Sequence, residues 1–312
     1  MKWKYDKRKI YDCLVEFINK TISEPSLKDS VLNALKFKLD DFIFSKLTYA
    51  HFCIWSKDEK LEDQVKIMAS VESFVLACDI LDDLQDMDTF DVPWMEIENK
   101  FSMDVFYVFM SLPDLLIQST TLSSDLKIQL LEIFAKFKMN AVNGQHKSLQ
   151  RQLMTEEEYL KMIESKSGSF MAFACLFGSI HASIEERKQI ESYAIHIGCS
   201  AQIENDLLGI SEKKNYKDIY TKEISLSIIY LLEFTNSHSI PLNEYYNNKL
   251  DKEQLIISSP DLKESIDNSG AIIYTRCMQS IQLEKACLII DGLYPNEADR
   301  NLIKNIVYGQ ES

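Results

Sequence analysis

Apolar residues recur at steps of three and four along almost the whole chain of 312 residues, which is the spacing of helices that bury one face. Only 8 glycines and 6 prolines interrupt this pattern, too few for the many turns of a sheet protein. Neither a repeat of solenoid length nor a low-complexity linker divides the sequence. We therefore expect a single all-α domain over residues 1–312, a helical bundle large enough to enclose a central apolar cavity.

The apolar spacing also predicts where the individual helices lie. They are expected at residues 7–20, 27–55, 62–87, 101–111, 123–149, 156–178, 184–209, 223–235, 250–257, 270–292 and 296–308. Proline interrupts helices, so breaks are expected where short polar stretches contain one. These stretches are SEPS (23–26), DVPW (91–94), SLPD (111–114) and SSPDL (258–262).

Charge and cysteine usage exclude several classes of protein. The formal net charge is −14, and an acidic surface repels the phosphate backbone of nucleic acids. None of the seven cysteines forms a CxxC pair, which favours buried thiols in a reducing compartment. No apolar run reaches the roughly 18 residues of a membrane span. We expect a cytoplasmic protein. Its short basic start, MKWKYDKRK, leaves a peripheral membrane contact open.

The stretch DILDDLQDMD (79–88) places five aspartates at the end of an apolar helical seam. The next members of that seam are Asp82 and Asp86, and Asp79 and Asp83 lie within about 100° of them around the helix. Clustered carboxylates repel one another and avoid an apolar interior, and a divalent cation removes this conflict. Oxygen ligands suit Mg²⁺. The pattern predicts a Mg²⁺ site, and an acidic helix end facing water is the alternative.

The helix expected at 184–209 shows the same change from apolar to polar. Its apolar seam ends at Ala201 and leads to Asn205. Gln202 and Asp206 share a face with Asn205 at helical spacing. Two such helices predict a deep apolar pocket with Mg²⁺ at its mouth, although a buried amide pair would explain the second helix alone.

Lysines near these helices could supply positive charge to the same pocket. Lys166 interrupts an aromatic seam, so it either reaches water or faces the cavity. Further lysines follow the second helix, of which one or two could contact a diphosphate: Lys213, Lys214, Lys217 and Lys222. A pocket with an apolar base and a cationic mouth suits an allylic prenyl diphosphate. Aromatic rings such as Phe170 and Phe173 could stabilise an allylic cation.

These motifs, in this order, resemble the trans-isoprenyl diphosphate synthase family over about residues 70–310. The matching stretches are DDLQD (82–86), GQ (144–145) with TEEEYLKMIESKSGSF (155–170), GCSAQIENDLLGI (198–210), KKNYKDIYTKEISL (213–226) and LYPNEADRNLI (293–303). The resemblance implies a class I terpenoid synthase fold. It also implies Mg²⁺ ligation and contacts with the allylic diphosphate. The residues concerned are Asp82 and Asp86 with Asp83 in support, Asn205 with Asp206, Lys166, Lys214 and Lys222, and Gln202 at the reaction centre.

The sequence departs from the family in three places. Residues 30–60 lack its Gly-Gly-Lys-Arg segment, and no arginine pair follows the first motif. The second motif has Asn205 for its first aspartate and Gly209 for its last. Since those basic groups hold the second diphosphate substrate in the family, the acceptor here is expected to be something else.

This combination is similar to the ComQ group of prenyltransferases, which serve quorum sensing in Gram-positive bacteria. That group attaches a geranyl or farnesyl chain to a tryptophan of the precursor peptide of a competence pheromone. The resemblance implies a Mg²⁺-dependent prenyltransferase whose partners are an allylic diphosphate and such a peptide. A class I terpene cyclase, a short-chain prenyl diphosphate synthase and a non-catalytic subunit of one remain as alternatives, and a homodimer is compatible with each.

Overall fold

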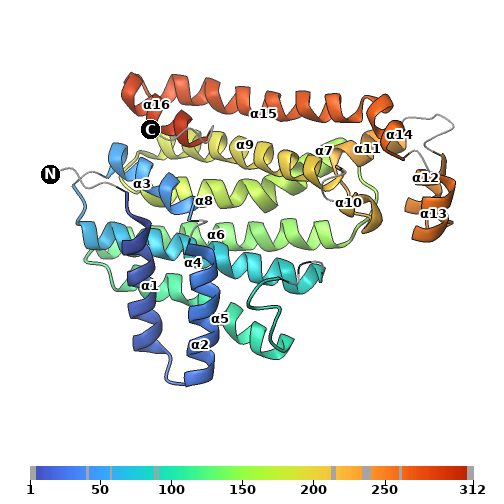
Figure 1. The fold of residues 1–312 in the computed structure, drawn as a ribbon. Helices are drawn as coiled ribbons and strands as arrows, with labels where there is room; N and C mark the ends of the chain where they lie inside the picture. The colour runs from blue at the N-terminus through green and yellow to red at the C-terminus, as the bar shows by residue number, and fades with distance from the viewer. Residues whose placement is uncertain are drawn as a thin grey trace. The chain divides into compact units, whose positions relative to one another are not determined.

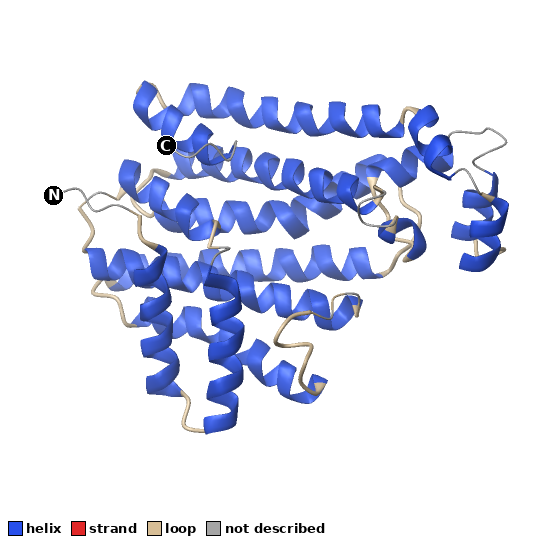
Figure 2. Cartoon of the chain, viewed as in Figure 1, coloured by secondary structure: helices blue, strands red, loops and turns tan. Residues whose placement is uncertain are grey.

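The computed structural model describes residues 5–39, 42–56, 58–87, 89, 91–211, 216–233, 240–259 and 262–307, apart from the side chain of Ser265. Every regular element in these ranges is a helix, as Figure 2 shows, so the all-α prediction is confirmed for the part of the chain described. None of those helices combines the length and the apolar character that crossing a membrane requires.

The chain divides into two compact units. Unit 1 comprises Met1–Met139, Phe170–Ala194 and Ile289–Ser312, and unit 2 comprises Asn140–Ser169 and Ile195–Leu288. Each unit is described by itself below. The expectation that residues 1–312 act as a single domain stays a prediction.

Unit 1 is built from ten helices or parts of helices. These are α1 (Lys7–Thr21), α2 (Pro25–Lys38), α3 (Phe44–Trp55), α4 (Leu61–Asp86), α5 (Asn99–Gln118), the first part of α6 (Ser124–Leu149), α8 (Ser169–Gly178), the first part of α9 (Ile184–Gly209), the end of α15 (Ala271–Leu293) and α16 (Glu297–Val307). Helix α4 is the central one. Its residues 63–77 are all buried except the half-buried Lys66, and it packs against α1, α3 and α5.

Helices α1 and α2 form an antiparallel pair at the start of unit 1 (Figure 1). The expected break at SEPS is confirmed. Pro25 is the first residue of α2 and the Glu24 side chain accepts a hydrogen bond from the backbone of Ser26, an arrangement in which the missing proline N–H costs nothing.

The single helix expected at 27–55 is wrong, because the structure has two helices there, α2 and α3. The start of the second helix, α3, is stabilised by a residue that is distant in the sequence. The backbone N–H of Ser45 donates to the buried carboxylate of Glu72 on α4, over 2.5 Å. The Tyr5 hydroxyl donates to the Phe42 carbonyl, over 2.8 Å. A buried acceptor for a first-turn N–H stabilises a new helix start.

The break expected at SLPD is also wrong, because α5 continues through Pro113 to Gln118. A proline inside a helix leaves the carbonyl four residues earlier without its usual donor. That carbonyl belongs to Phe109, and it accepts a hydrogen bond of 2.7 Å from the Ser73 hydroxyl on α4. Tertiary contact with α4 therefore replaces the hydrogen bond that Pro113 cannot make.

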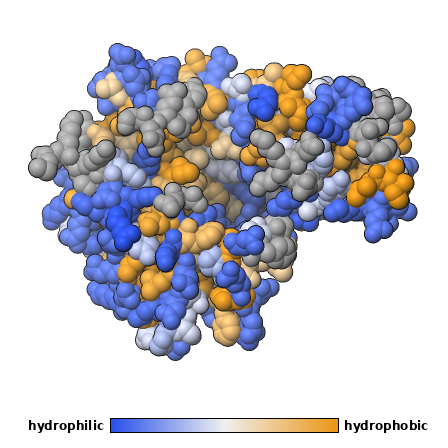
Figure 3. All heavy atoms as spheres, viewed as in Figure 1, coloured by the Kyte–Doolittle hydropathy of each residue, from blue (hydrophilic) through white to orange (hydrophobic). Residues whose placement is uncertain are grey.

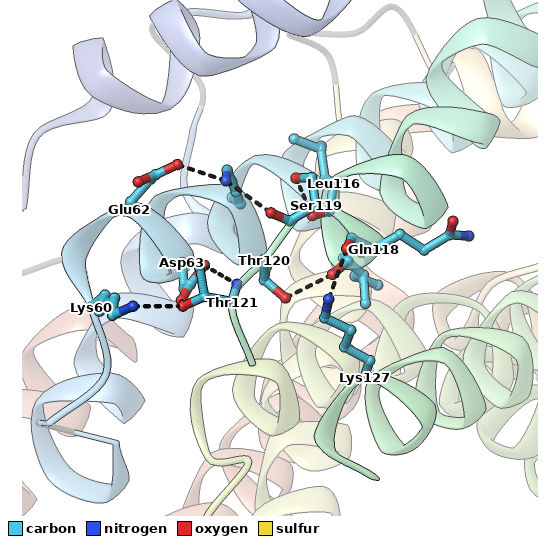
Figure 4. A network of polar contacts seen from close by, with 11 residues as sticks. Lys60, Glu62, Asp63, Leu116, Gln118, Ser119, Thr120, Thr121 and Lys127 are labelled. Carbon is cyan, nitrogen blue, oxygen red and sulfur yellow. Dashed lines mark hydrogen bonds and ion pairs between the residues drawn. The ribbon is translucent and has the colours of Figure 1, made fainter. Parts of the chain in front are cut away.

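The C-terminal end of α5 is fastened to the start of α4 by the polar network in Figure 4. The buried Asp63 carboxylate accepts from the backbone N–H of Thr121 (2.8 Å) and from its hydroxyl (2.6 Å). Lys66 donates to the Ser119 carbonyl (3.0 Å), and Lys127 donates to the Gln118 carbonyl (2.8 Å). Both lysines satisfy carbonyls that a helix end leaves unpaired; Lys66 belongs to α4 and fixes α5 beside it, whereas Lys127 belongs to α6.

A buried chain of hydrogen bonds crosses unit 1 from α3 to the end of α15. Trp55 donates to the Tyr294 hydroxyl over 3.3 Å, the Tyr294 and Tyr193 hydroxyls lie 2.9 Å apart, and Tyr193 contacts His51 Nε2. His51 Nδ1 lies 2.7 Å from the Leu47 carbonyl, which can only accept. Nδ1 therefore carries the hydrogen and Nε2 accepts from Tyr193. Burial lowers the pKa of His51 to about 4, so the ring is neutral.

Unit 2 contains the remaining helices and its own apolar core. Its elements are the rest of α6, α9 and α15 with α7 (Glu156–Ile163), the π-helix η2 (Glu164–Gly168), α10 (Lys217–Tyr220), α11 (Leu226–Glu233), α12 (Ile240–Tyr246), α13 (Lys252–Ser258) and α14 (Leu262–Ser269). Its core includes the fully buried Ile203, Ile228 and Leu255. Figure 3 shows apolar surface where Figure 1 labels α12 and α13, and Ile257 on α13 is 78% exposed.

Most of the longer expected helices are confirmed. The helices at 62–87, 123–149, 184–209, 270–292 and 296–308 begin and end within one residue of the structure. The helical stretch at 156–178 is present but contains η2. The three helices that were missed, α10, α12 and α14, have at most eight residues, too short for a periodic pattern to stand out.

Candidate active site

The aspartates of the first motif occupy the last turns of α4. Asp79, Asp82, Asp83 and Asp86 are all half-buried, and α4 ends at Met87 in a left-handed conformation. The C-terminal end of a helix carries partial negative charge, so four carboxylates there are unfavourable without cations or donors. The Asp79 side chain keeps 41% of its surface exposed, so the place of these aspartates on the inner face of α4 stays a prediction.

Two contacts within unit 1 compensate part of that negative charge. Lys38, the last residue of α2, forms an ion pair of 2.8 Å with Asp79. The indole N–H of Trp94 donates to Asp83 over 2.9 Å. Burial raises the pKa of Asp79 above its ordinary range, and the charge of Lys38 opposes that shift. Sequence reasoning missed both partners, because neither lies at helical spacing from the motif.

Asp82 and Asp86 lie one turn apart on α4 and suit a metal that is held only in part by protein. Within the residues described, no three Asp, Glu, His or Cys side chains gather as a complete metal site. Mg²⁺ usually takes one or two carboxylates together with waters and substrate phosphates. The pair therefore fits Mg²⁺ in its usual protein setting, and would not form an all-protein cage.

The second motif lies on the unit 2 part of α9 and centres on Asp206. This carboxylate is 9% exposed. One oxygen accepts from the Tyr159 hydroxyl and the other from the Gln202 amide, over 2.7 Å for the latter. The Ser167 hydroxyl donates in turn to Gln202. Burial raises the pKa of Asp206 to about 6. Each oxygen keeps a second lone pair, so the network holds Asp206 in place and still permits ligation.

The apolar seam expected on α9 is wrong at its end. Ala201 and Asn205 are exposed, whereas Ile203 and Asp206 are buried. Each step of four residues advances a seam by about 40° around the helix, so the seam extended by such steps turned away from the unit 2 core. Asn205 remains accessible to a ligand, while Gln202 and Asp206 belong to the packed side.

Lys166 lies in the π-helix η2 and is half-buried. Two glycines allow the neighbouring helices to approach this segment closely. A Cβ on Gly144 of α6 would lie 2.4 Å from the backbone nitrogen of Lys166, and one on Gly198 of α9 would lie 2.5 Å from the backbone carbonyl oxygen of Ser167. Burial raises the pKa of Asp206, and the positive charge of Lys166 opposes that shift. Lys166 therefore acts electrostatically on the second motif.

The remaining predicted lysines have different outcomes. Lys214 lies outside the described residues. Lys222 donates to Asn248 over 2.6 Å, and its ammonium lies 4.3 Å from the centre of the Tyr245 ring. In this arrangement Lys222 faces α12 and the turn that follows it, so a contact with a diphosphate requires it to leave Asn248.

Gly209, at the place of the last aspartate of the family motif, lies against a carboxylate from elsewhere in unit 2. A Cβ on Gly209 would lie 1.8 Å from an oxygen of Asp218. Glycine in place of the family's last aspartate therefore leaves room for the carboxylate of Asp218. The spacing of the sequence gave no sign of this pairing.

The fold defines the class of protein. Geranylgeranyl pyrophosphate synthase from Corynebacterium glutamicum, whose crystal structure is complexed with isoprenyl diphosphate and magnesium, superimposes with a TM-score of 0.83 and 17% identity over 98% of each chain. A geranylgeranyl pyrophosphate synthase structure that covers 99% of this chain and 100% of its own gives 0.80 at 20% identity. The chain has the class I terpenoid synthase fold that the sequence motifs implied.

The sequence comparisons define the family. The family described as Polyprenyl synthetase matches residues 44–259, so the chain belongs to it. Tryptophan prenyltransferase ComQ of Bacillus subtilis subsp. natto (strain BEST195) is 28% identical over 280 residues, which cover 89% of this chain and 85% of that protein. Tryptophan prenyltransferase ComQ of Bacillus subtilis (strain 168) is 27% identical over 296 residues, covering 91% and 95%. The resemblance to the ComQ group is confirmed.

Proposed function

We propose that this protein is a Mg²⁺-dependent prenyltransferase that moves a geranyl or farnesyl group from its diphosphate to a tryptophan of a precursor peptide. The observation that carries this function is the similarity to proteins named tryptophan prenyltransferase over about nine tenths of the chain. Membership of the Polyprenyl synthetase family supports an allylic diphosphate as the donor.

The residues of the two motifs have separate proposed roles. Asp82 and Asp86 ligate Mg²⁺, and Asp83 supports them. Asn205, which is exposed, and Asp206, which is held by two hydrogen bonds, are the proposed ligands of the second motif. When bound, Mg²⁺ neutralises the leaving diphosphate, so that the carbon–oxygen bond of the allylic substrate breaks more easily.

Three lysines and an amide also have proposed roles toward the donor. Lys166, Lys214 and Lys222 contact the diphosphate, since charge-assisted hydrogen bonds to phosphate oxygens are strong. Gln202 lines the reaction centre, where Asp206 and Ser167 fix both ends of its amide.

Aromatic residues of unit 1 can protect the cation that ionisation leaves behind. Phe74 and Phe170 have ring centres 5.8 Å apart, and Phe74 and Phe173 pack edge to face at 5.0 Å. Phe74 precedes Asp82 by two turns of α4, about 12 Å at 1.5 Å per residue. Such rings attract a cation and exclude water. The central apolar cavity that would hold the prenyl chain stays a prediction.

The acceptor is inferred from the charges that the sequence lacks. The loop after the first motif carries no arginine pair, and residues 30–60 lack the family's basic segment, so a second diphosphate has no equivalent binding groups. A neutral indole needs none. One of its ring carbons attacks the allylic carbon, a carbon–carbon bond forms, diphosphate leaves, and the proton lost from the indole passes to solvent or to the diphosphate.

The test is incubation of the purified protein and Mg²⁺ with geranyl, farnesyl or geranylgeranyl diphosphate. Each donor is offered either a tryptophan-containing peptide or isopentenyl diphosphate, and products are identified by mass spectrometry. The expected result is a prenylated peptide whose modification lies on tryptophan. Elongated prenyl diphosphates with an unmodified peptide would instead identify a short-chain synthase, and a cyclic hydrocarbon would identify a cyclase.

The double variant Asp82→Asn/Asp86→Asn tests the assignment of the metal ligands. The rate of prenyl transfer is expected to fall at least about a hundredfold, while the circular dichroism spectrum and the melting temperature stay unchanged. The neighbouring carboxylates of Asp79 and Asp83 cannot replace direct metal ligands. Asp125→Asn, at an exposed position of α6, is the matched control. Normal transfer by the double variant would show that these carboxylates do not hold the metal.

Two further expectations accompany the proposed function. Light scattering of the purified protein tests for a homodimer, and fractionation of producing cells tests the expected cytoplasmic location, with or without peripheral membrane association.

A further inference from the structure

The four aspartates at the end of α4 fall into two stripes. Asp79 and Asp83 lie one turn apart, and so do Asp82 and Asp86, with about 60° between the two stripes at 100° per residue. The first stripe faces contacts from α2 and from the loop before α5, namely the Lys38 ion pair at 2.8 Å and the Trp94 hydrogen bond at 2.9 Å. The second stripe holds the proposed Mg²⁺ ligands.

Trp94 is itself fixed from several sides within unit 1. Its side chain is only 2% exposed. The ring of Phe37, which directly precedes Lys38 in α2, meets it at 90° with centres 5.6 Å apart. The Ser102 hydroxyl of α5 donates to the Trp94 carbonyl over 2.5 Å. An indole held in this way presents its N–H in one direction, toward Asp83.

A hydrogen bond from this indole changes what Asp83 can do. Asp83 is adjacent to Asp82 and one turn before Asp86, so its charge repels both. A donated N–H stabilises that charge and fixes the carboxylate on its own stripe. A buried indole N–H needs some acceptor, and here the acceptor is a carboxylate of the motif.

We infer that Trp94 and Lys38 are positioning residues that hold the Asp79–Asp83 stripe so that Asp82 and Asp86 keep the geometry Mg²⁺ requires. This inference rests on the proposed function. Partners that orient a ligating group typically change metal affinity by about 10- to 100-fold. Trp94→Phe keeps a smaller aromatic ring and loses the donor, so it is expected to raise the Mg²⁺ concentration for half-maximal effect about tenfold. Lys38→Met is expected to raise it several-fold.

The experiment measures the rise in melting temperature that Mg²⁺ produces in the presence of inorganic pyrophosphate, together with the Mg²⁺ dependence of prenyl transfer. Trp55→Phe is the matched control, because it removes the indole donor to Tyr294 and leaves the motif untouched. For Trp94→Phe, the half-maximal Mg²⁺ concentration is expected to rise with little change in the rate at saturating Mg²⁺. In an Asp83→Asn background, Trp94→Phe is expected to add little.

Each outcome decides a different question. If the wild type responds to Mg²⁺ and Trp94→Phe responds at the same concentrations, the positioning role is wrong and the proposed function stands. If the wild type neither responds to Mg²⁺ nor transfers a prenyl group, the proposed function and this inference both fail. If Trp94→Phe does not fold, Ser102→Ala replaces it. That variant releases only the Trp94 backbone and must show a smaller shift in the same direction, or the inference is refuted.

Discussion

Acidification is expected to weaken the buried hydrogen-bond chain of unit 1 through His51. Its pKa falls from the ordinary 6.5 to about 4 because the ring is fully buried. The unfolded chain therefore binds a proton at a higher pH than the folded one. The stability that His51 contributes is complete above pH 6.5 and is lost as the pH falls from 6.5 toward 4.

The size of this effect follows from the two pKa values. A difference of about 2.5 units corresponds to about 3 kcal/mol when the change is complete, at 1.36 kcal/mol per unit. At pH 5 the two pKa values correspond to a loss of about 2 kcal/mol in the unfolding free energy. Burial raises the pKa of Glu72 to about 7, which has the opposite dependence on pH, so the wild-type curve alone would show only part of the loss.

Urea unfolding of the wild type and of His51→Asn isolates the contribution of the histidine. Asparagine can donate to the Leu47 carbonyl but does not titrate, so Glu72 affects both proteins equally. The difference in unfolding free energy between them is expected to shrink by about 2 kcal/mol from pH 7.5 to pH 5. Tyr193→Phe, which keeps the histidine, should follow the wild-type pH dependence. A difference between wild type and His51→Asn that is constant with pH would refute the assignment of a neutral His51.

Two further predictions concern close packing and the proline in α5. Gly144→Ala would place a methyl group 2.4 Å from the backbone of the π-helix and is expected to lower the unfolding free energy by about 1–3 kcal/mol. The control is Gly292→Ala in α15, where nothing lies within 4 Å of the new methyl group, and it is expected to be neutral or stabilising. Urea unfolding measures both variants. Ser73→Ala leaves the buried Phe109 carbonyl without its donor and is expected to cost about 1–3 kcal/mol. Ser111→Ala, exposed on α5, should cost less than about 0.5 kcal/mol, and equal losses in the two serine variants would contradict the role given to Ser73.

Long helices could be predicted because each carries many periodic residues. Helix α9 (Ile184–Gly209) has the bounds that its apolar spacing predicts. Helix bounds could not be predicted from local sequence where a side chain distant in the sequence decides them. Pro113 does not end α5 because Ser73 serves the carbonyl it leaves. The start of α3 depends on Glu72, which lies 27 residues away from Ser45.

The residue types of the candidate site could be predicted, but their supports could not. Asp82 and Asp86 stood out because aspartates continued an apolar seam. Trp94 and Lys38 lie outside any periodic pattern that contains the motif, and only the packing of α2 and the loop before α5 brings them to it. Asn205 is exposed although it was expected to continue the apolar seam of α9, because a seam extended by steps of four drifts around the helix.

The π-helix between α7 and α8 makes the length of this stretch as important as its composition. A π-turn holds one more residue than an α-turn, so the helical spacing of side chains changes across it. Tyr159 before it is buried in unit 2, and Phe173 after it is buried in unit 1. Deleting one residue from Glu164–Gly168 would shift the helical positions of the side chains that follow by about 100°. A deletion of one residue here is therefore expected to displace Tyr159 or Phe173 from its buried position.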